Sequence, residues 1–270
     1  MTGRRVLRAG ALAYLALLVL GPVLMVVVRT FSSGPGPVVA ALTSPEAVHA
    51  AQVSLLLVAI AVPVNTVFGV VCAFVLVRYQ PPGSGLVAAA VDLPFAVSPV
   101  VLGLALFVLY GRGGWFGPVL AEHGVDVVFA LPGMVLATIF VSLPFVASEV
   151  APVLAEAGVE AEQAAETLGA SGWQTLVRIT LPAIRWGVTY GVVLTTARAL
   201  GEFGAVAIIS GNLVGATQTL PLYVEDRFEG FDLTGAYAAG LLLALIAVAV
   251  LVVLTRLHRR LDPTSAPEET

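Results

Sequence analysis

Two ionisable side chains stand out because of where they lie in the sequence. Arg198 and Glu202 interrupt an apolar stretch that runs from Trp186 to about residue 210. A charge at the centre of a membrane-spanning helix costs about 2.5–3.5 kcal/mol, so each one needs a partner. Four residues apart, the two side chains share one helix face and are expected to pair. Arg198 follows Trp186 by about 18 Å of helix, which places it near the middle of a bilayer.

The pair allows two functional interpretations. It is expected to face a bundle interior or a subunit interface, where the neighbouring Gly201 and Gly204 allow close backbone approach or a local bend. In the first interpretation this stretch lines or gates a path for an anion. The arginine attracts the anion, and the glutamate prevents the path from binding it too tightly. In the second, the pair is structural and holds the helix against a neighbour. The residues alone leave both open.

Composition places these charges in a membrane protein. Of the 270 residues 59% are hydrophobic and 11% are charged, with a mean hydropathy of +0.99, whereas about a quarter of the residues in globular chains are charged. All 13 basic residues are arginines. The absence of lysine excludes a Walker A phosphate loop, a lysine Schiff base and a Ser–Lys nucleophile pair. Scattered charges offer no basic patch for nucleic acid.

The metal-binding and nucleophilic residue types are too few and too scattered for a catalytic centre. Cys72 is the one cysteine and lies within an apolar run, which excludes a disulfide framework and a thiolate metal cluster. The three histidines fall in loops or at a helix end. We therefore expect no bound metal and no intramembrane protease.

The apolar runs predict an all-α integral membrane protein, with six transmembrane helices in a single domain that covers residues 1–270. Each run has the length of about 20 mainly apolar residues that crosses a bilayer. The approximate ranges are 9–28, 53–77, 91–111, 127–149, 186–210 and 233–255. The first run is too long for the apolar core of a signal peptide, and no convincing cleavage site follows, so we expect an uncleaved helix.

Arginine placement predicts the orientation. With the N-terminus inside, nine arginines fall in cytoplasmic segments and three in outer segments, with Arg198 in the membrane. This distribution satisfies the positive-inside rule. We therefore expect a multi-pass membrane protein with both termini in the cytoplasm. Residues 256–270 are expected to form a cytoplasmic tail with a short disordered end.

The loop at 151–185 is the most informative segment outside the spans. Glutamates at 156, 160, 162 and 166 lie among alanines, which favours a short helix with an acidic face that ends at Gly169. Ser171 and Gln174 then fit a capping box that starts a second helix. The sequence therefore predicts a helix–turn–helix hairpin on the cytoplasmic side.

The second helix of this hairpin is expected to pack one side against the protein. The residues that recur at helical spacing are Trp173, Leu176, Val177 and Thr180. Leu181 and Pro182 are expected to end the helix before the fifth span. The hairpin contains no histidine or cysteine, so it is either a docking element for a cytoplasmic partner or a loop that packs under the bundle.

The same segment resembles the EAA loop of ABC importer permeases. That family's pattern is Glu-Ala-Ala, three residues, Gly, nine residues, then Ile-x-Leu-Pro. The residues that match its positions are Gln163, Ala164, Ala165, Gly169, Ile179, Leu181 and Pro182. Gln163 departs from the family's Glu, and Glu162 stands beside it, rotated by about 100° on a helix. The resemblance implies a type I ABC importer permease fold whose coupling loop sits in a cleft on an ATPase subunit.

Further segments look like permeases of the sulfate/molybdate type, most of all the CysW-type subunits of sulfate/thiosulfate importers. The match covers roughly residues 10–260, and its motifs lie at 92–99, 110–117, 129–138, 199–205 and 219–222. The resemblance implies a place in the bacterial inner or plasma membrane and a heterodimer with a second, CysT-like permease. It also implies a dimer of CysA-like ABC ATPases and an extracytoplasmic sulfate-binding protein. ATP and Mg would be held by the ATPase, so this chain would carry no cofactor and would not be an enzyme itself.

Three alternatives stay open at this point. A molybdate or tungstate permease would use one subunit type as a homodimer. A self-sufficient secondary transporter is disfavoured by the predicted hairpin and by the lack of an intramembrane acidic relay. A membrane enzyme lacks a nucleophile–base pair or a metal constellation.

Overall fold

The computed structural model describes residues 2–260. Within them it contains six membrane-spanning units when each bent helix pair is counted as one. Four units are long and apolar enough to cross a bilayer singly: α1 (Thr2–Phe31), α3 (Pro45–Phe74) with the π-helical turn η1 (Val75–Tyr79), α7 (Leu131–Ser142) with α8 (Pro144–Glu156), and α15 (Leu233–Arg260). The two bent pairs are α4 (Ser84–Ala96) with α5 (Pro99–Tyr110), and α12 (Arg185–Leu200) with α13 (Gly204–Ser210). No strand occurs among residues 2–260. The predicted all-α membrane architecture is confirmed.

The third unit differs from the single straight span expected over 91–111. Its two helices, α4 and α5, meet at 109°. Val97 and Ser98 between them are extended, with ψ near 130°, because the ring of Pro99 disfavours a helical conformation in the residue before it. Pro99 itself fits the first turn of α5, where its missing N–H removes no helical hydrogen bond.

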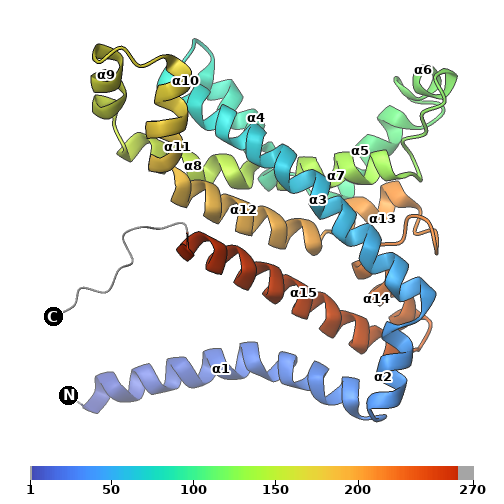
Figure 1. The fold of residues 1–270 in the computed structure, drawn as a ribbon. Helices are drawn as coiled ribbons and strands as arrows, with labels where there is room; N and C mark the ends of the chain where they lie inside the picture. The colour runs from blue at the N-terminus through green and yellow to red at the C-terminus, as the bar shows by residue number, and fades with distance from the viewer. Residues whose placement is uncertain (1, 261–270) are drawn as a thin grey trace.

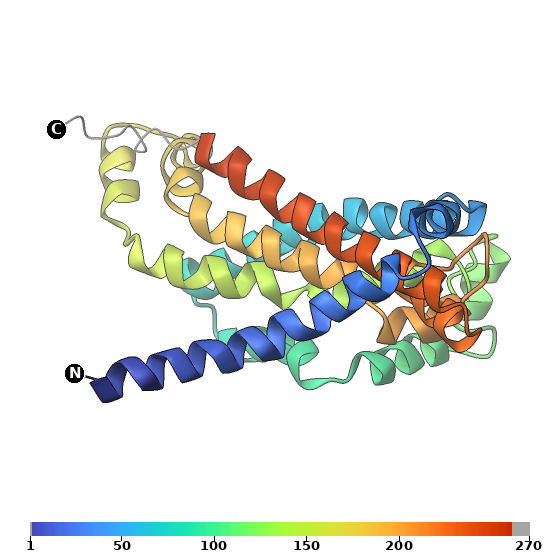
Figure 2. The ribbon, with the colours of Figure 1, turned by 90° about the horizontal axis from the view of Figure 1, so that it is seen from below.

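Short helices lie at the two ends of the bundle (Figure 1). The helices α2 (Pro35–Leu42), α6 (Gly117–Glu122) and α14 (Leu220–Glu229) lie at one end. The opposite end carries α9 (Glu160–Thr167), α10 (Gly172–Thr175), the π-helical turn η2 (Leu176–Thr180) and α11 (Leu181–Ala183). At this second end α1 begins and α15 ends. Figure 2 shows α1 along the side of the bundle, where it packs against α15.

Glycines allow α8 to pack closely between α3 and α12. A Cβ atom on Gly69 of α3 would lie 2.5 Å from Val146 Cβ, and one on Gly191 of α12 would lie 2.7 Å from Val146 Cα. A Cβ on Gly187 would lie 2.7 Å from the Glu149 carbonyl oxygen. Helices in lipid gain little from the hydrophobic effect on association, so close contact through small residues is a main source of their packing energy. These glycines therefore set the spacing of the three helices.

The side chain of Asn65 satisfies a carbonyl at the break in hydrogen bonding between α7 and α8. Leu143 N donates to Phe140 O at 3.3 Å, one residue short of the helical partner, and leaves the Ile139 carbonyl without its usual donor. Asn65 Nδ2, from α3, donates to Ile139 O at 3.0 Å and to Ser142 Oγ at 2.8 Å. A helix break within the membrane persists only where such a partner exists.

Several boundaries lie beyond the predicted ranges. The fourth unit continues to Glu156, so the loop expected from 151 begins inside α8, and Glu156 belongs to α8 rather than to the acidic helix of the hairpin. The last helix continues to Arg260, so the tail expected from 256 begins as helix. Residues 261–270 of that tail lie outside the described residues.

We expect Gly69→Ala to lower the stability of the purified chain by about 1–3 kcal/mol, the usual cost of overpacking. The reason is the overlap of the new methyl group with Val146 and with Ala147 N. The measurement is the thermal unfolding midpoint in detergent. Gly240→Ala in α15 is the matched control, because among the described residues no atom beyond its chain neighbours and its own helix backbone lies within 4 Å of its Cβ position. Equal midpoints for the two variants would contradict the packing argument.

Candidate functional site

The predicted hairpin projects from one end of the bundle, between α8 and α12 (Figure 1). Its first arm, α9, ends at a turn where Gly169 has φ +86°, a conformation that side chains disfavour. Gly169 N donates to Glu166 O at 2.9 Å and Ala170 N donates to Ala165 O at 3.0 Å. These bonds satisfy carbonyls at the end of α9.

The predicted capping box starts the second arm. Gln174 N donates to Ser171 Oγ at 3.4 Å, and Ser171 N donates to Gln174 Oε1 at 2.9 Å. The arm then continues through α10, η2 and α11, so the expectation that Leu181 and Pro182 end it is wrong. The break falls later, at Ile184. The π-helical turn before Pro182 shifts the hydrogen-bond register, which lets the helix absorb a residue without an N–H.

The second arm presents a different side to the protein than helical spacing predicts. Trp173 is 72% exposed and Val177 is also exposed, whereas Thr175 and Thr180 are buried. The expectation that Trp173 and Val177 pack inward is therefore wrong. The other two residues of the expected inner side, Leu176 and Thr180, are half-buried and buried, so the prediction holds for them. The π-helical turn at 176–180 changes the helical register only from Leu176 onward, and Trp173 lies before it. At the tip of the hairpin, Leu168 is 88% exposed.

The residues that match the EAA pattern divide between the surface and the interior. Ala165 is buried and Ile179 is half-buried, so each arm has one matching residue that packs against the protein. The matching residues on the surface are Gln163, Ala164, Gly169, Leu181 and Pro182. The outer surface of the hairpin therefore combines these residues and the large apolar side chains of Leu168 and Trp173 with the charged side chains of Glu160, Glu166 and Arg178.

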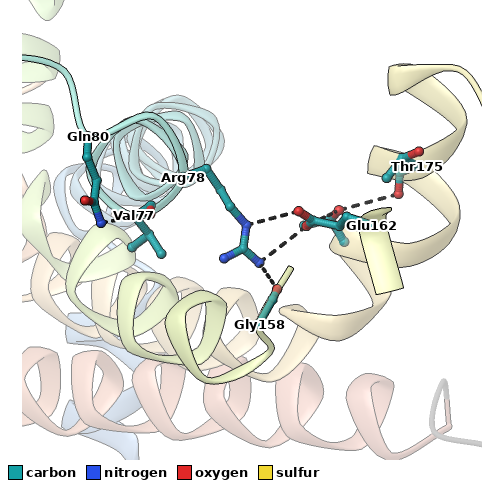
Figure 3. Close-up of polar contacts among 7 residues, drawn as sticks. Val77, Arg78, Gln80, Gly158, Glu162 and Thr175 are labelled. Atoms are coloured by element: carbon teal, nitrogen blue, oxygen red, sulfur yellow. Dashed lines mark hydrogen bonds and ion pairs between the residues drawn. The ribbon is translucent and has the colours of Figure 1, made fainter. Parts of the chain in front are cut away.

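The carboxylate of Glu162 points inward and joins three segments (Figure 3). Arg78 at the end of α3 donates from Nε to Glu162 Oε2 at 3.1 Å and from Nη2 to Oε1 at 3.4 Å. Thr180 Oγ1, on the second arm, donates to Glu162 Oε1 at 2.8 Å. Sequence reasoning missed Arg78 and Thr180 as partners. Arg78 is 84 residues away from Glu162, and no local pattern links residues at that separation.

The expected pairing of Arg198 and Glu202 is present. Arg198 Nη2 lies 2.6 Å from Glu202 Oε2, and the two side chains are 29% and 2% exposed. Glu202 Oε1 also accepts a hydrogen bond from Ala205 N at 2.9 Å, in the first turn of α13. Glu202 thus satisfies a free N–H at a helix start and neutralises an arginine at the same time.

The pair lies at the 51° bend between α12 and α13. Gly204 is needed for packing there, because a Cβ atom on it would lie 3.1 Å from Pro99 Cβ at the start of α5. Gly201 is exposed and has only the Ala197 carbonyl within 4 Å of its Cβ position, at 3.6 Å. Of the two glycines expected to allow close approach or a local bend, Gly204 lies in a close contact and Gly201 lies at the bend, directly after α12.

Helix α12 joins the hairpin to the ion pair. It begins at Arg185, directly after the second arm, and ends at Leu200 beside the pair. Its 16 residues span about 24 Å, so the two candidate sites lie at opposite ends of one helix and not in one cavity. Among the described residues no three His, Cys, Asp or Glu side chains are placed to hold a metal ion.

Comparison with known proteins identifies the architecture. Residues 65–265 match the model of the binding-protein-dependent transport system inner membrane component family. The chain belongs to this family. It is a multi-pass membrane permease, and its relatives are permease subunits of ABC transporters.

Two relatives of this permease come from one organism, Synechococcus elongatus. Its sulfate transport system permease protein CysW is 50% identical over 250 residues, which cover 93% of this chain and 87% of that protein. Its permease protein CysT is 41% identical over 245 residues, covering 91% and 88%. The fold also matches a crystal structure of a bacterial alginate ABC transporter with a TM-score of 0.81, 17% identity and coverage of 97% and 96%. At that identity the match supports the fold alone.

Proposed function

We propose that this chain is the CysW-type permease subunit of an ATP-driven sulfate/thiosulfate importer. The observation that carries the proposal is the rigid hairpin, which projects from one end of a bundle of spanning helices and is joined through α12 to an ion pair within the fifth span. The sulfate substrate is supported by the names of the CysW and CysT relatives. Nothing in the fold or the comparisons favours the molybdate homodimer.

The hairpin docks on a separate CysA-like ATPase. Its outer face exposes the large apolar side chains of Leu168 and Trp173 on a backbone fixed by the capping box and the Gly169 turn. Preorganised aromatic and aliphatic anchors of this kind dominate the energy of protein interfaces. ATP and Mg²⁺ bind to the ATPase dimer, and this chain carries no cofactor of its own.

Sulfate passes between this chain and a second, CysT-like permease beside α12. The exposed residues Tyr190, Leu194, Ala197 and Gly201 share one face of α12, and Arg198 borders it with 29% of its side chain exposed. A partly exposed charge at this depth is costly against lipid, so the face belongs against protein or a water-filled path. Arg198 attracts the oxyanion, and Glu202 limits how strongly it is held.

The hairpin end of the bundle lies in the cytoplasm, and the opposite end meets the extracytoplasmic sulfate-binding protein. The arginine distribution supports this orientation, and both α1 and α15 have one end on the hairpin side (Figure 1). When the ATPase pair closes, the hairpin moves with it and α12 carries the movement to the ion pair. The occurrence of distinct CysW and CysT relatives in one organism supports a heterodimer.

Co-expression with a CysA-like ATPase, a CysT-like permease and the sulfate-binding protein tests the assignment. We expect a complex with both permeases whose ATPase activity in proteoliposomes is stimulated by sulfate-loaded binding protein. The chain alone is expected to hydrolyse no ATP. A homodimeric complex stimulated by molybdate instead would refute the sulfate assignment, and failure to recover any ATPase would refute the importer.

The double variant Leu168→Ala/Trp173→Ala is expected to weaken ATPase binding about tenfold or more, because each interface anchor contributes more than about 1 kcal/mol. The measurement is the amount of ATPase retained by the purified permeases over a dilution series. Trp115→Ala is the matched control, since Trp115 is exposed in the loop that precedes α6 at the opposite end. Equal retention by the two variants would exclude the hairpin face as the docking site.

For the ion pair, Arg198→Gln is expected to lower sulfate transport per folded complex about tenfold, the effect of removing a favourable charge of about 1–2 kcal/mol from the path. Arg198→Lys keeps the charge and is expected to lose less. Thermal unfolding is measured in parallel. If Arg198→Gln and Glu202→Gln lower the midpoint equally while transport per folded complex stays at the native level, the pair is structural and not part of the path.

A further inference from the structure

Arg78 connects the hairpin to a second spanning helix. It lies in η1, at the end of α3, and its side chain is 13% exposed against 19% for Glu162. Besides its two bonds to the Glu162 carboxylate, Nη2 donates to the Gly158 carbonyl at 2.5 Å. Gly158, with φ +65°, forms the turn between α8 and α9. One guanidinium therefore holds both the entry to the hairpin and its first arm (Figure 3).

The connection extends to the returning arm. Thr180 Oγ1 donates to the same carboxylate at 2.8 Å, and Thr180 is 3% exposed. Arg78 and Thr180 each lie within a π-helical turn, η1 and η2, a local distortion often found at functional sites. A largely buried carboxylate with two charge-assisted bonds and a hydroxyl donor is held more firmly than a surface ion pair.

Helix α3 reaches from this connection to the other end of the protein. Together α3 and η1 form a unit of 35 residues, well beyond the 20 or so that cross a bilayer. Near its other end, Ser54 Oγ accepts a hydrogen bond from Leu220 N, the first residue of α14, at 2.8 Å. Both Ser54 and Leu220 are buried. The hairpin is thus linked through α3 to the end opposite the ATPase side.

We infer that Arg78 is a positioning residue that makes α3 move together with the hairpin. Movement of the hairpin is then transmitted to two spans, α3 and α12. This inference rests on the proposed function. Through α3 and α14, a movement of the hairpin reaches the extracytoplasmic end, and by thermodynamic linkage a movement at that end reaches the hairpin. The Arg78–Glu162–Thr180 contact therefore couples ATP hydrolysis to sulfate delivery.

The test uses the full transporter in proteoliposomes and measures sulfate transported per ATP hydrolysed. We expect Arg78→Gln to lower this ratio about fivefold or more, the range of common coupling strengths, while the complex still assembles and still hydrolyses ATP. Arg78→Lys keeps the charge and is expected to restore part of the ratio. Arg29→Gln is the matched control, because Arg29 lies near the end of the spanning helix α1 and is exposed.

Further variants separate coupling from mere stability. Glu162→Gln and Thr180→Val are expected to lower the same ratio, and Arg78→Gln/Glu162→Gln is expected to be no worse than Arg78→Gln, because both changes remove one interaction. A normal ratio in folded Arg78→Gln complexes, or effects that multiply in the double variant, would overturn the inference. Loss of the wild-type complex itself would instead overturn the proposed function.

A distance measurement covers the case in which Arg78→Gln does not fold. Spin labels on exposed Tyr79, at the end of η1, and exposed Ala164, on α9, report the separation of the two segments with the Arg78–Glu162 pair intact. We expect the same distance in the nucleotide-free and ATP-bound transporter. A separation that changes with nucleotide would show that α3 does not follow the hairpin and would refute the inference.

Discussion

Close packing among α3, α8 and α12 places every functional element of this protein. Gly69, Gly187 and Gly191 provide no side chain where these helices meet, so their backbones come together. Helix α3 continues into η1, which holds Arg78, α8 leads into the hairpin and α12 leaves it. The spacing that the glycines permit therefore also sets the distance at which Arg78 reaches Glu162. In a bilayer, where apolar side chains gain little by leaving lipid, such contact is a principal way to fix helix positions.

Breaks in the spanning helices follow a second constraint, that polar backbone groups in lipid need partners inside the protein. At the break between α7 and α8 the partner is Asn65, which donates to the Ile139 carbonyl. At the bend between α12 and α13 it is Glu202, which accepts from Ala205 N and pairs with Arg198. Each of these two breaks is therefore tied to one buried polar side chain, whereas the 109° bend between α4 and α5 follows from Pro99.

The EAA-like hairpin differs from the family pattern in the position of its acidic side chain. The exposed position that matches the family's Glu holds Gln163, and the adjacent Glu162 is turned inward by the helical rotation of about 100° per residue. Its carboxylate accepts hydrogen bonds from Arg78 and Thr180 within the chain. Gln163 itself adds no charge to a surface that also carries the exposed Glu160 and Glu166, and the Glu162 carboxylate acts as an internal connection.

The sequence by itself determined the features that depend on near neighbours. Apolar runs of spanning length predicted the six spans, the Ser171–Gln174 capping box and the Gly169 turn predicted the hairpin, and a spacing of four predicted the pairing of Arg198 with Glu202. Only the tertiary structure decided the 109° bend before Pro99, the inward side of the second arm and the contact of Glu162 with Arg78. The position of the bend follows from Pro99, but no periodic pattern encodes its angle. The other two features depend on a π-helical turn and on packing between distant segments, and neither leaves a periodic signal in the sequence.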